Sequence, residues 1–357
     1  MNSNSLYTLQ QDAIALLKEL ITTPSYSREE DQTAGLLCRF LGTRNIEHSR
    51  VGNNVFAFNR HFDKSKPTIL LNSHHDTVKP NPQYTKDPFS AVVEDGKLFG
   101  LGSNDAGGCL VSLIASFLHF YERPSLRYNI ALAATAEEEI SGTGGIEKTL
   151  PYLPAIDFAI VGEPTQMQMA VAERGLMVLD CVSHGKAGHA ARNEGDNSIY
   201  KALKDIEWFR TYQLEKISPL LGPSKMSVTV IETENKAHNV VPAVCRFVVD
   251  TRINELYTFE EVIDIIKTHV SCEVKPRSTR LRSTSISLEH PIIKAGIELG
   301  RTYYGSPTTS DKALMPFPAL KIGPGDSARS HTADEYIYLS EINEGIELYI
   351  HFLEKVV

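Results

Sequence analysis

Carboxylate and imidazole side chains gather in five short segments of this chain, and each segment follows an apolar run or lies at a glycine turn. The segments are Thr68–Asp76, Gly100–Asp105, Ile130–Glu139, Phe158–Pro164 and Lys321–His331. In an open α/β sheet, side chains at the carboxyl ends of the strands converge on one crevice. One imidazole from the first segment, one from the last and carboxylates from the middle three would suit two zinc ions and a bridging water. The sequence therefore predicts a metallohydrolase.

The first segment ends in an H-x-D pattern formed by His74 and Asp76. Residues two apart on a strand share a face, so both side chains can point at the same site. We expect His74 to bind metal, and Asp76 to fix the tautomer of its ring and raise its basicity. His75 faces the opposite way, and we expect it to be structural. By itself, the tripeptide also fits a solvated polar loop.

Asp105 and the run Glu137–Glu139 supply the central carboxylates. Asp105 precedes an apolar helix and could bridge two cations with its two oxygens, although a helix-capping role explains the position as well. Three adjacent glutamates at the end of an apolar strand repel one another unless a cation compensates them. One of them could bind metal while its neighbour faces the substrate water; the alternative is an exposed acidic turn. Glu163 and His331 are each ambiguous alone.

The elements that must position these residues follow an α/β pattern as far as about residue 165. Apolar residues at helical spacing predict a helix over residues 9–21. Ser27 with Glu30 forms a capping-box pattern that should open a second helix. Strand and helix patterns then alternate, which predicts βαβ units and a largely parallel sheet. The apolar run Gly108–Phe120 predicts a helix buried between layers.

From about Glu173 the pattern changes to β-α-β-β-α-β, the order of a ferredoxin-like sandwich. Its expected strands and helices are Leu176–Val182, Asn197–Leu214, Lys225–Ile231, Val244–Asp250, Phe259–Val270 and Thr284–Leu288. The α/β pattern then resumes with a helix over 291–304, a strand over 319–322 and a final helix from Glu341. We therefore expect a catalytic α/β domain formed by residues 1–172 and 284–357, into which residues 173–283 are inserted as an α+β domain.

Composition and charge narrow the class of protein. The chain has 357 residues, enough for two domains with cores of their own. Its net charge of −8 argues against nucleic acid or an anionic membrane surface as the main partner. The five cysteines are scattered without a C-x-x-C motif, which favours reduced thiols. No targeting pattern stands at the amino terminus and no apolar run is long enough to span a membrane, so we expect a soluble cytoplasmic protein.

The ordered set of motifs resembles the acetylornithine deacetylase / succinyl-diaminopimelate desuccinylase family of co-catalytic zinc amidohydrolases over essentially the whole chain. The segments that carry the resemblance are Asn72-Ser73-His74-His75-Asp76, Gly100–Asp105, Thr135-Ala136-Glu137-Glu138-Glu139, Gly162-Glu163-Pro164-Thr165 and Ser330-His331-Thr332-Ala333-Asp334-Glu335. The chain departs from the family's pattern beside the ligands: Asn72-Ser73 replace serine-glycine, Leu101 replaces arginine and Glu137 replaces aspartate.

The resemblance implies a role for each member of the set. The implied ligands of two divalent metal ions are His74, Asp105, Glu139, Glu163 and His331. Asp105 would bridge the ions, and Glu138 would be the general base that activates a water between them. Zinc is the ion implied by the family, although the ligand types suit cobalt or manganese too. The implied fold is a zinc-exopeptidase-like mixed sheet with helices on both faces, and the inserted domain would serve as lid and dimerisation domain of a homodimer.

Three residues of the inserted domain gain roles from the resemblance. His189, in the segment from His184, is implied to reach a partner subunit's site and polarise the scissile carbonyl. Asn239 and Arg252 lie in segments that resemble the family's lid motifs, and Arg252 is implied to grip a substrate carboxylate, for which its fork is suited. Without the resemblance, His189 reads as an ordinary loop histidine and Arg252 as half of a surface ion pair.

The best interpretation is hydrolysis of a small N-acyl amino acid. The GEPT and GPG segments look most like acetylornithine deacetylase and its close relatives, which favours N-acetylornithine or N-succinylornithine in arginine biosynthesis. Lys312 and Arg329 could pair with a succinyl carboxylate, although both fit a solvated surface equally well. The turn at Gly325 allows backbone to approach a ligand closely. The alternatives are a dipeptidase or aminopeptidase, and a metal-binding protein without catalysis, against which the retention of Glu138 speaks.

Overall fold

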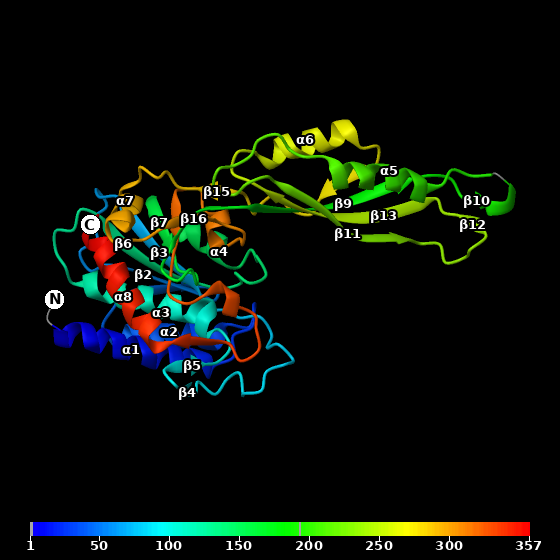
Figure 1. Ribbon diagram of the computed structural model, residues 1–357. Coiled ribbons are helices and arrows are strands. Elements are labelled where there is room, and N and C mark those ends of the chain that lie inside the picture. The colour runs from blue at the N-terminus through cyan, green and yellow to red at the C-terminus, as the bar shows by residue number, and fades with distance from the viewer. Residues whose placement is uncertain (1–2, 193) are drawn as a thin grey trace. The chain divides into compact units, whose positions relative to one another are not determined.

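The computed structural model describes residues 3–192 and 194–357, which fall into two compact units (Figure 1). Unit 1 contains the described residues up to Val171, together with Ile286–Tyr304 and Ser310–Val357. Unit 2 contains Ala172–Ser285 and Gly305–Thr309. The short segment Gly305–Thr309 therefore groups with the insertion, whereas the sequence assigned it to the catalytic domain. Residues 1 and 2, the start of the expected catalytic domain, lie outside the described residues.

Unit 1 is built on a large mixed sheet. The strands of this sheet are β1 (His48–Val51), β2 (Asn54–Phe58), β3 (Thr68–His74), β6 (Asn129–Thr135), β7 (Ile156–Val161), β8 (Met169–Glu173), β15 (Thr284–Ser285), β16 (Tyr303–Ser306) and β17 (Ala319–Lys321). They run in the order β1-β2-β6-β3-β7-β17-β8-β15, with β16 paired to β8. The residues of β15, and the last residues of β8 and β16, fall within the ranges of unit 2. A small separate sheet contains β4 (Val93–Glu94), β5 (Lys97–Phe99) and β18 (Tyr336–Tyr338).

Four neighbouring strands of the large sheet, β6, β3, β7 and β17, are parallel. Every residue of β3 and of β6 is buried, as expected for central strands covered on both faces. Because parallel strands end at the same edge, the segments that follow His74, Thr135, Val161 and Lys321 all leave the sheet on one side. This edge carries the predicted metal ligands His74, Glu139 and Glu163, which end or follow β3, β6 and β7.

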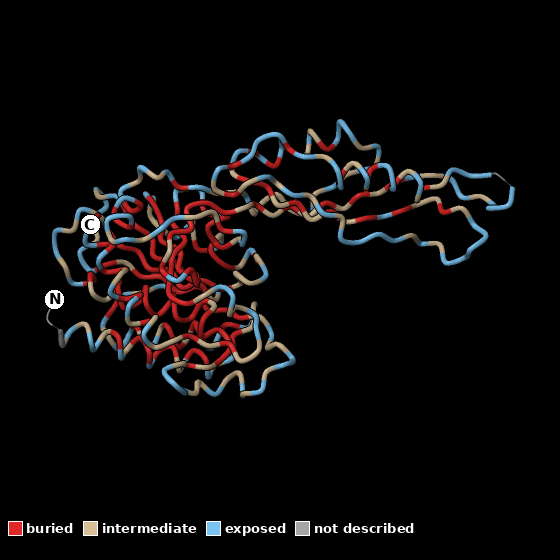
Figure 2. Tube along the Cα trace, in the orientation of Figure 1, coloured by how far each residue is buried: buried red, intermediate tan, exposed pale blue. Residues whose placement is uncertain are grey.

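Helices cover both faces of this sheet. They are α1 (Ser3–Ile21), α2 (Asp31–Gly42), α3 (Gly108–Tyr121), α4 (Ile146–Thr149), α7 (Pro291–Glu298) and α8 (Leu339–Glu354). Helix α3 packs on β3 and β6 and is itself backed by α1 and α8. It is buried along almost its whole length, which confirms the helix predicted between layers (Figure 2). The other face is covered around Ile146 of α4 and Met315. The fold class is thus the predicted mixed α/β sheet.

Unit 2 is an α+β sandwich. Its elements are β9 (Gly175–His184), β10 (Gly188–His189), α5 (Ser198–Thr211), β11 (Lys225–Thr233), β12 (Val240–Val241), β13 (Val244–Ile253), α6 (Phe259–His269) and β14 (Glu273–Pro276). The antiparallel sheet has the order β11-β13-β9-β14, which is that of a ferredoxin-like fold. Phe209 of α5 and Ile266 of α6 share one core with Leu179 and Phe247, so both helices pack on the same face of the sheet.

Three details of the predicted elements were wrong, namely a helix cap, a helix end and a strand pairing. Helix α2 begins at Asp31 without a side-chain cap, because Ser27 and Glu30 bond elsewhere, as described below. The helix predicted over residues 291–304 ends at Glu298, and Gly300 follows with a left-handed φ of 75°. The last strand of the insertion is Glu273–Pro276, paired with β9, whereas Thr284–Ser285 pairs with β8 of the large sheet.

The cysteines and the longest apolar helices were also the subject of predictions. All five cysteines are free thiols. Among the helices of the described residues, none has the length and apolar character needed to cross a membrane.

Candidate metal centre

His74, the last residue of β3, lies at the centre of a group of carboxylates. Its side chain is 1% exposed, and its Nε2 lies 3.3 Å from Asp105 Oδ1. The same nitrogen lies 3.8 Å from Glu163 Oε1 and 3.9 Å from Glu138 Oε2. Three carboxylates from three different segments thus converge on one imidazole at the carboxyl edge of the sheet.

His331 forms a second focus beside the first. Its Nε2 lies 2.8 Å from Glu139 Oε2 and 3.6 Å from Asp105 Oδ2. The two oxygens of Asp105 therefore face two different imidazoles, one oxygen each. Among the described residues, no side chain caps the amino terminus of α3, so the helix-capping interpretation of Asp105 is not supported. The arrangement has the geometry of a carboxylate that bridges two positions.

The structure brings the five predicted ligands together. The ligand atoms of His74, Glu138 and Glu163 lie within 4.8 Å of one another, and so do those of His74, Asp105 and Glu139. Glu138 stands as close to His74 as Glu163 does, although the family resemblance gives Glu138 the role of a base. These residues offer imidazole nitrogen and carboxylate oxygen, the donors that bind zinc, manganese or cobalt.

Asp76 has a wider role than the sequence predicted. His74 Nδ1 lies 3.1 Å from the Asp76 carbonyl oxygen and 3.4 Å from Oδ1, so the ring is oriented by backbone and carboxylate together. Asp76 Oδ1 accepts the backbone N–H of Glu138 at 3.1 Å, and Oδ2 accepts that of Glu139 at 3.2 Å. Ser27 Oγ also donates to Oδ2 at 2.6 Å. One carboxylate therefore positions both the imidazole and the glutamate turn.

The glutamate turn is held in place rather than exposed. Glu137 adopts a left-handed φ of 54°, and its backbone N–H donates to Glu30 Oε1 at 3.2 Å. Its carboxylate lies against the chain at Gly142 and Gly144, where a Cβ atom would lie 2.0 Å and 2.1 Å from the carboxylate oxygens. At Gly142 a Cβ atom would also lie 2.6 Å from Glu137 Cβ, so a larger residue there would displace the turn. Glu138 and Glu139 are consequently aimed at the site by a fixed backbone.

The adjacent His75 faces away from the carboxylates, as predicted. Its Nδ1 pairs with Thr33 Oγ1 at 2.9 Å, and its Nε2 lies 2.9 Å from the Asn53 carbonyl oxygen. Burial lowers the pKa of His75, so the ring is neutral and structural.

The electrostatics of the site favour bound cations. Burial raises the pKa of Glu138 well above its usual range, and the neighbouring Glu163 carboxylate raises it further. Burial alone would lower the pKa of His74, but hydrogen bonds to Asp105 and Asp76 raise it well above the usual value. The hydrogen bond to Glu139 raises the pKa of His331 to about 9. In this arrangement the crowded carboxylates favour protonated imidazole rings. A divalent cation would take the place of those protons and balance the negative charge.

Three buried polar residues at the site were missed by the sequence analysis. Asp311 Oδ2 accepts from Thr135 Oγ1 at 2.7 Å directly beneath the glutamate turn, and burial raises the pKa of Asp311 to about 6. Asn104 and Glu335 bond to the segments that carry Asp105 and His331. The available signal for Asp311 was its position two residues before the apolar stretch Ala313–Met315. Asn104 and Glu335 stood inside quoted motifs without a role.

The cations proposed to bind substrate are already engaged. Lys312 is buried, and its Nζ donates to the Ala170 carbonyl at 3.4 Å. Arg329 forms two hydrogen bonds to the Glu341 carboxylate, of 2.9 Å and 2.5 Å. Gly325 adopts a φ of 88° and packs beneath the Asn104 amide. The alternative interpretation of Lys312 and Arg329 as solvated surface residues is wrong, because Lys312 is buried and the Arg329 guanidinium is paired with Glu341. Their contact with substrate stays a prediction.

The remaining predicted residues belong to unit 2. His189 in β10 is exposed and pairs across the ladder with Val240, and Asn239 accepts the backbone N–H of Ala190 at 3.0 Å. These two predicted residues thus lie on adjoining segments. Arg252 of β13 forms a bidentate pair with Asp250, with hydrogen bonds of 2.8 Å and 3.0 Å. The guanidinium is half-buried and is oriented by that pair.

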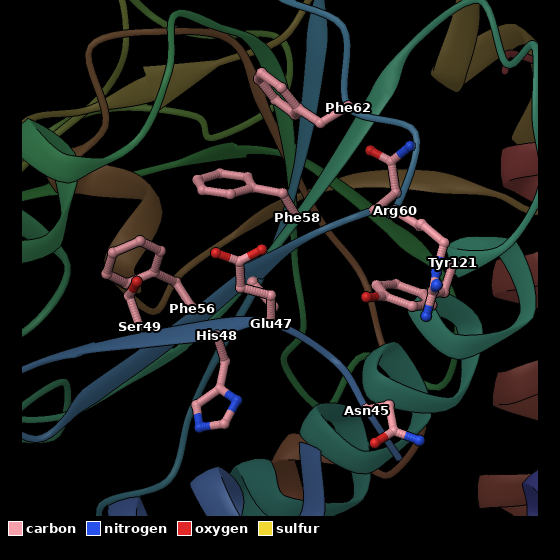
Figure 3. Close-up of a pocket in the computed structure, with 11 residues that line it drawn as sticks. Asn45, Glu47, His48, Ser49, Phe56, Phe58, Arg60, Phe62 and Tyr121 are labelled. Atoms are coloured by element: carbon pink, nitrogen blue, oxygen red, sulfur yellow. The ribbon is translucent and has the colours of Figure 1, made fainter. Parts of the chain in front are cut away.

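A cavity of about 420 Å³ lies elsewhere in unit 1. Figure 3 shows Phe58, Phe62 and Tyr121 among its lining residues, with Glu47 and Arg60 beside them. Phe58 pairs with Ala131, near the amino-terminal end of β6, whereas Glu137–Glu139 follow the carboxyl end of that strand. The cavity is therefore at the opposite end of the sheet from the metal centre.

The sequence model of the family described as "Peptidase family M20/M25/M40" matches residues 70–355. Among curated relatives, the succinyl-diaminopimelate desuccinylase of Acidiphilium cryptum is 26% identical over 374 residues, covering 97% of this chain and 99% of its own. The enzyme of the same name from Cereibacter sphaeroides is 29% identical over 267 residues, covering 71% and 70%.

Two solved structures of similar fold are peptidases by name. Aminopeptidase PepT from Bacillus cereus has a TM-score of 0.78 at 18% identity, over 97% of this chain and 98% of its own. A dinuclear metal-binding peptidase of the M20 family from Bacillus subtilis has a TM-score of 0.75 at 16% identity, with the same coverage of 97% and 98%. At these identities the likeness establishes the fold alone.

Proposed function

Because the chain belongs to peptidase family M20/M25/M40, we propose that it is a metal-dependent hydrolase that cleaves the amide bond of a small N-acyl amino acid. The observation that carries this proposal is the position of Asp105. Its Oδ1 lies 3.3 Å from His74 Nε2 and its Oδ2 lies 3.6 Å from His331 Nε2, as required of a residue that bridges two cations. His74 and Glu163 would complete one cation site, and Glu139 and His331 the other.

Two divalent cations, for which zinc is the first choice, would supply Lewis acidity at these two sites and lower the pKa of the attacking water. Glu138 would accept the proton of that water and deliver it to the departing amine. The position of Glu138 supports this role, since its backbone N–H is held by Asp76. The Glu138 carboxylate lies among the ligands, and the described structure shows no hydrogen bond from it to His331. Asp76 bonds to both His74 and the glutamate turn, so it fixes the distance between the base Glu138 and the ligands His74 and Glu139.

Two residues of unit 2 complete the proposed mechanism. His189 would polarise the scissile carbonyl, and its exposed ring is available to do so. Arg252 would bind the substrate carboxylate through a guanidinium that Asp250 already orients. Truncating either side chain should raise KM or lower kcat without loss of metal, because neither residue is a ligand.

The proposal for the acyl group rests on the charge of the substrate and of the residues near the metal centre. The curated relatives are named as desuccinylases, and a succinyl substrate carries a second carboxylate that needs a cation. Lys312 and Arg329 are engaged elsewhere, but Lys79 is exposed, and the described structure gives it no hydrogen bond or ion pair. Lys79 lies on the loop that leaves Asp76 and reaches Asn81, whose Nδ2 lies 3.4 Å from the His331 carbonyl oxygen. We therefore favour an N-succinyl amino acid, such as N-succinylornithine or N-succinyl-diaminopimelate, over N-acetylornithine.

A peptidase is the second candidate, because the family and several of the similar structures, aminopeptidase PepT among them, are named for peptide hydrolysis. The decisive experiment is a hydrolysis panel with the zinc-loaded chain. It should contain N-succinyl and N-acetyl forms of ornithine, lysine and diaminopimelate, together with dipeptides and tripeptides. Release of succinate at the highest kcat/KM supports the proposal, whereas faster release of amino acids from peptides favours the second candidate. Bound metal with no turnover on any substrate would overturn both.

We also propose that unit 2 forms a homodimer. Strand β11 is an edge strand, and Val230 and Ile231 on it are exposed, as are Tyr200 and Leu203 of the neighbouring α5. An open ladder with apolar side chains is suited to pairing with a second copy. Sedimentation should show a dimer that Ile231→Lys dissociates; a wild-type monomer at all concentrations would contradict this.

A further inference from the structure

Glu335 bonds to three backbone N–H groups of the segment that carries Asp105. Its Oε1 accepts from Asn104 and from Asp105, each at 2.9 Å, and its Oε2 accepts from Gly102 at 3.1 Å. The side chain is buried, so these hydrogen bonds replace water as partners of the carboxyl group. The backbone of Asp105 is therefore fixed by a residue four positions beyond His331.

Asn104 makes the reciprocal connection. Its Oδ1 accepts the Asp326 N–H at 3.0 Å, and its Nδ2 donates to the Asp326 carbonyl at 3.0 Å and to Ser330 Oγ at 3.4 Å. The residue is fully buried. A Cβ atom on Gly325 would lie 2.5 Å from Asn104 Oδ1, so the glycine allows the amide to lie across the turn. Asn104 thus holds the start of the loop that ends at Glu335.

These contacts matter because His331, although its ring contacts Glu139 and Asp105, lies on a solvent-exposed loop. Its side chain is 54% exposed, and its backbone has a left-handed φ of 61°. The loop that carries it, residues 326–335 (the His331 loop), is tied at its start by Asn104 and at its end by Glu335. Both ties lead to the segment 102–105, whose last residue is Asp105. The distance between these two ligands is consequently set by two residues that bind no metal.

We propose that Asn104 and Glu335 are positioning residues that clasp the His331 loop to the Asp105 segment and so set the affinity of the metal centre. This inference rests on the proposed function in one respect, the identity of His331 and Asp105 as metal ligands. Partners that orient ligands typically change metal affinity by roughly 10- to 100-fold when they are altered.

The test compares isosteric variants with a matched control on the same loop. Glu335→Gln cannot accept the Gly102 N–H through its amide nitrogen, and Asn104→Asp places a carboxylate oxygen against the Asp326 carbonyl. Asp334→Asn is the control, because Asp334 accepts from Thr85 and Lys86 at 2.9 Å on the outer side of the loop and does not touch the Asp105 segment. The full-length chain is stripped with a chelator and titrated with Zn²⁺ by calorimetry, and circular dichroism checks that each variant is folded.

We expect Glu335→Gln and Asn104→Asp to weaken Zn²⁺ binding at one or both positions by about 10- to 100-fold. Excess Zn²⁺ should restore most of kcat, with KM unchanged, which loss of general stability would not produce. Asp334→Asn should lower the melting temperature and leave Zn²⁺ affinity unchanged. Wild-type affinity in both clasp variants, or an equal loss in Asp334→Asn, would overturn the inference. A wild-type chain that binds two Zn²⁺ but hydrolyses nothing defeats the proposed function only, whereas one that binds no Zn²⁺ defeats both.

Discussion

His331 Nε2 lies 2.8 Å from Glu139 Oε2, although 192 residues separate the two in the sequence. The contact joins the turn after β6 to the loop after β17, two strands that are not neighbours in the sheet. Asp105, which comes from no strand of the large sheet, closes the group by facing His331 with one oxygen and His74 with the other.

Substitution of the adjacent residues Glu138 and Glu139 should affect catalysis and metal binding differently. Glu138→Gln should keep two cations and lose about 10²- to 10⁴-fold in kcat, because it removes a general base. Glu139→Gln removes the partner of His331 and should lose metal as well as activity. Metal content and kcat measured on both variants decide the roles. Because Glu138 also lies within ligand distance of His74 and Glu163, loss of metal in Glu138→Gln would make it a ligand instead.

Asp76 should act through the glutamate turn as well as through His74. In Asp76→Asn, one carboxylate oxygen becomes an amide that cannot accept the N–H of Glu138 or Glu139, so metal affinity should fall by about 10- to 100-fold. Ser27→Ala removes one hydrogen bond to the same carboxylate and should cost about 1 kcal/mol of stability with little change in metal affinity. Zn²⁺ titration and urea unfolding of both variants give the comparison. Equal metal affinities in Asp76→Asn and wild type would contradict the role.

The convergence of the ligands was predictable because the strands that end at His74, Thr135 and Val161 each contain a run of at least three consecutive apolar residues. Such strands are central and parallel, so the position of each polar residue at their ends follows from topology. Asp105 and His331 needed the motif order in addition, since neither ends one of these strands. The buried helix over residues 108–120 followed from its apolar character alone.

Most of the misses share one physical cause, tertiary hydrogen bonds that the local sequence does not reveal. Ser27 and Glu30 match a capping box locally, yet tertiary hydrogen bonds to Asp76 and Glu137 take their side chains instead. Asn104 and Glu335 bond mainly to backbone groups of distant segments, and such bonds leave no periodic trace in a sequence. Strand β14 was overlooked because it is a short edge strand that ends in Pro276, a residue that disfavours central strands.

Lys79 should select for an acidic acyl group. Exposed charge pairs contribute roughly 0.2–1 kcal/mol, so Lys79→Ala should lower kcat/KM for an N-succinyl substrate by up to about fivefold. The matching N-acetyl substrate, which lacks the second carboxylate, should be unaffected. Lys86→Ala is the control, because it removes the same charge from the same loop at a lysine already paired with Glu94 at 2.6 Å. Equal effects of both variants on both substrates would show that only net charge matters.

His119 should make stability depend on pH. Burial lowers the pKa of His119 to about 4, and the positive charge of Arg123, whose Nη2 bonds to its ring, adds to this effect. The unfolded imidazole has a pKa of about 6.5, so between these values the unfolded chain binds a proton that the folded chain does not. The contribution of His119 to the free energy of unfolding is therefore complete above about pH 6.5 and is lost as pH falls toward 4. His119→Gln should flatten this decline in urea unfolding at pH 7.5, 6 and 5, whereas His351→Gln, at an exposed position of α8, should leave it as in wild type. A slope unchanged in His119→Gln would assign the acid sensitivity to other groups.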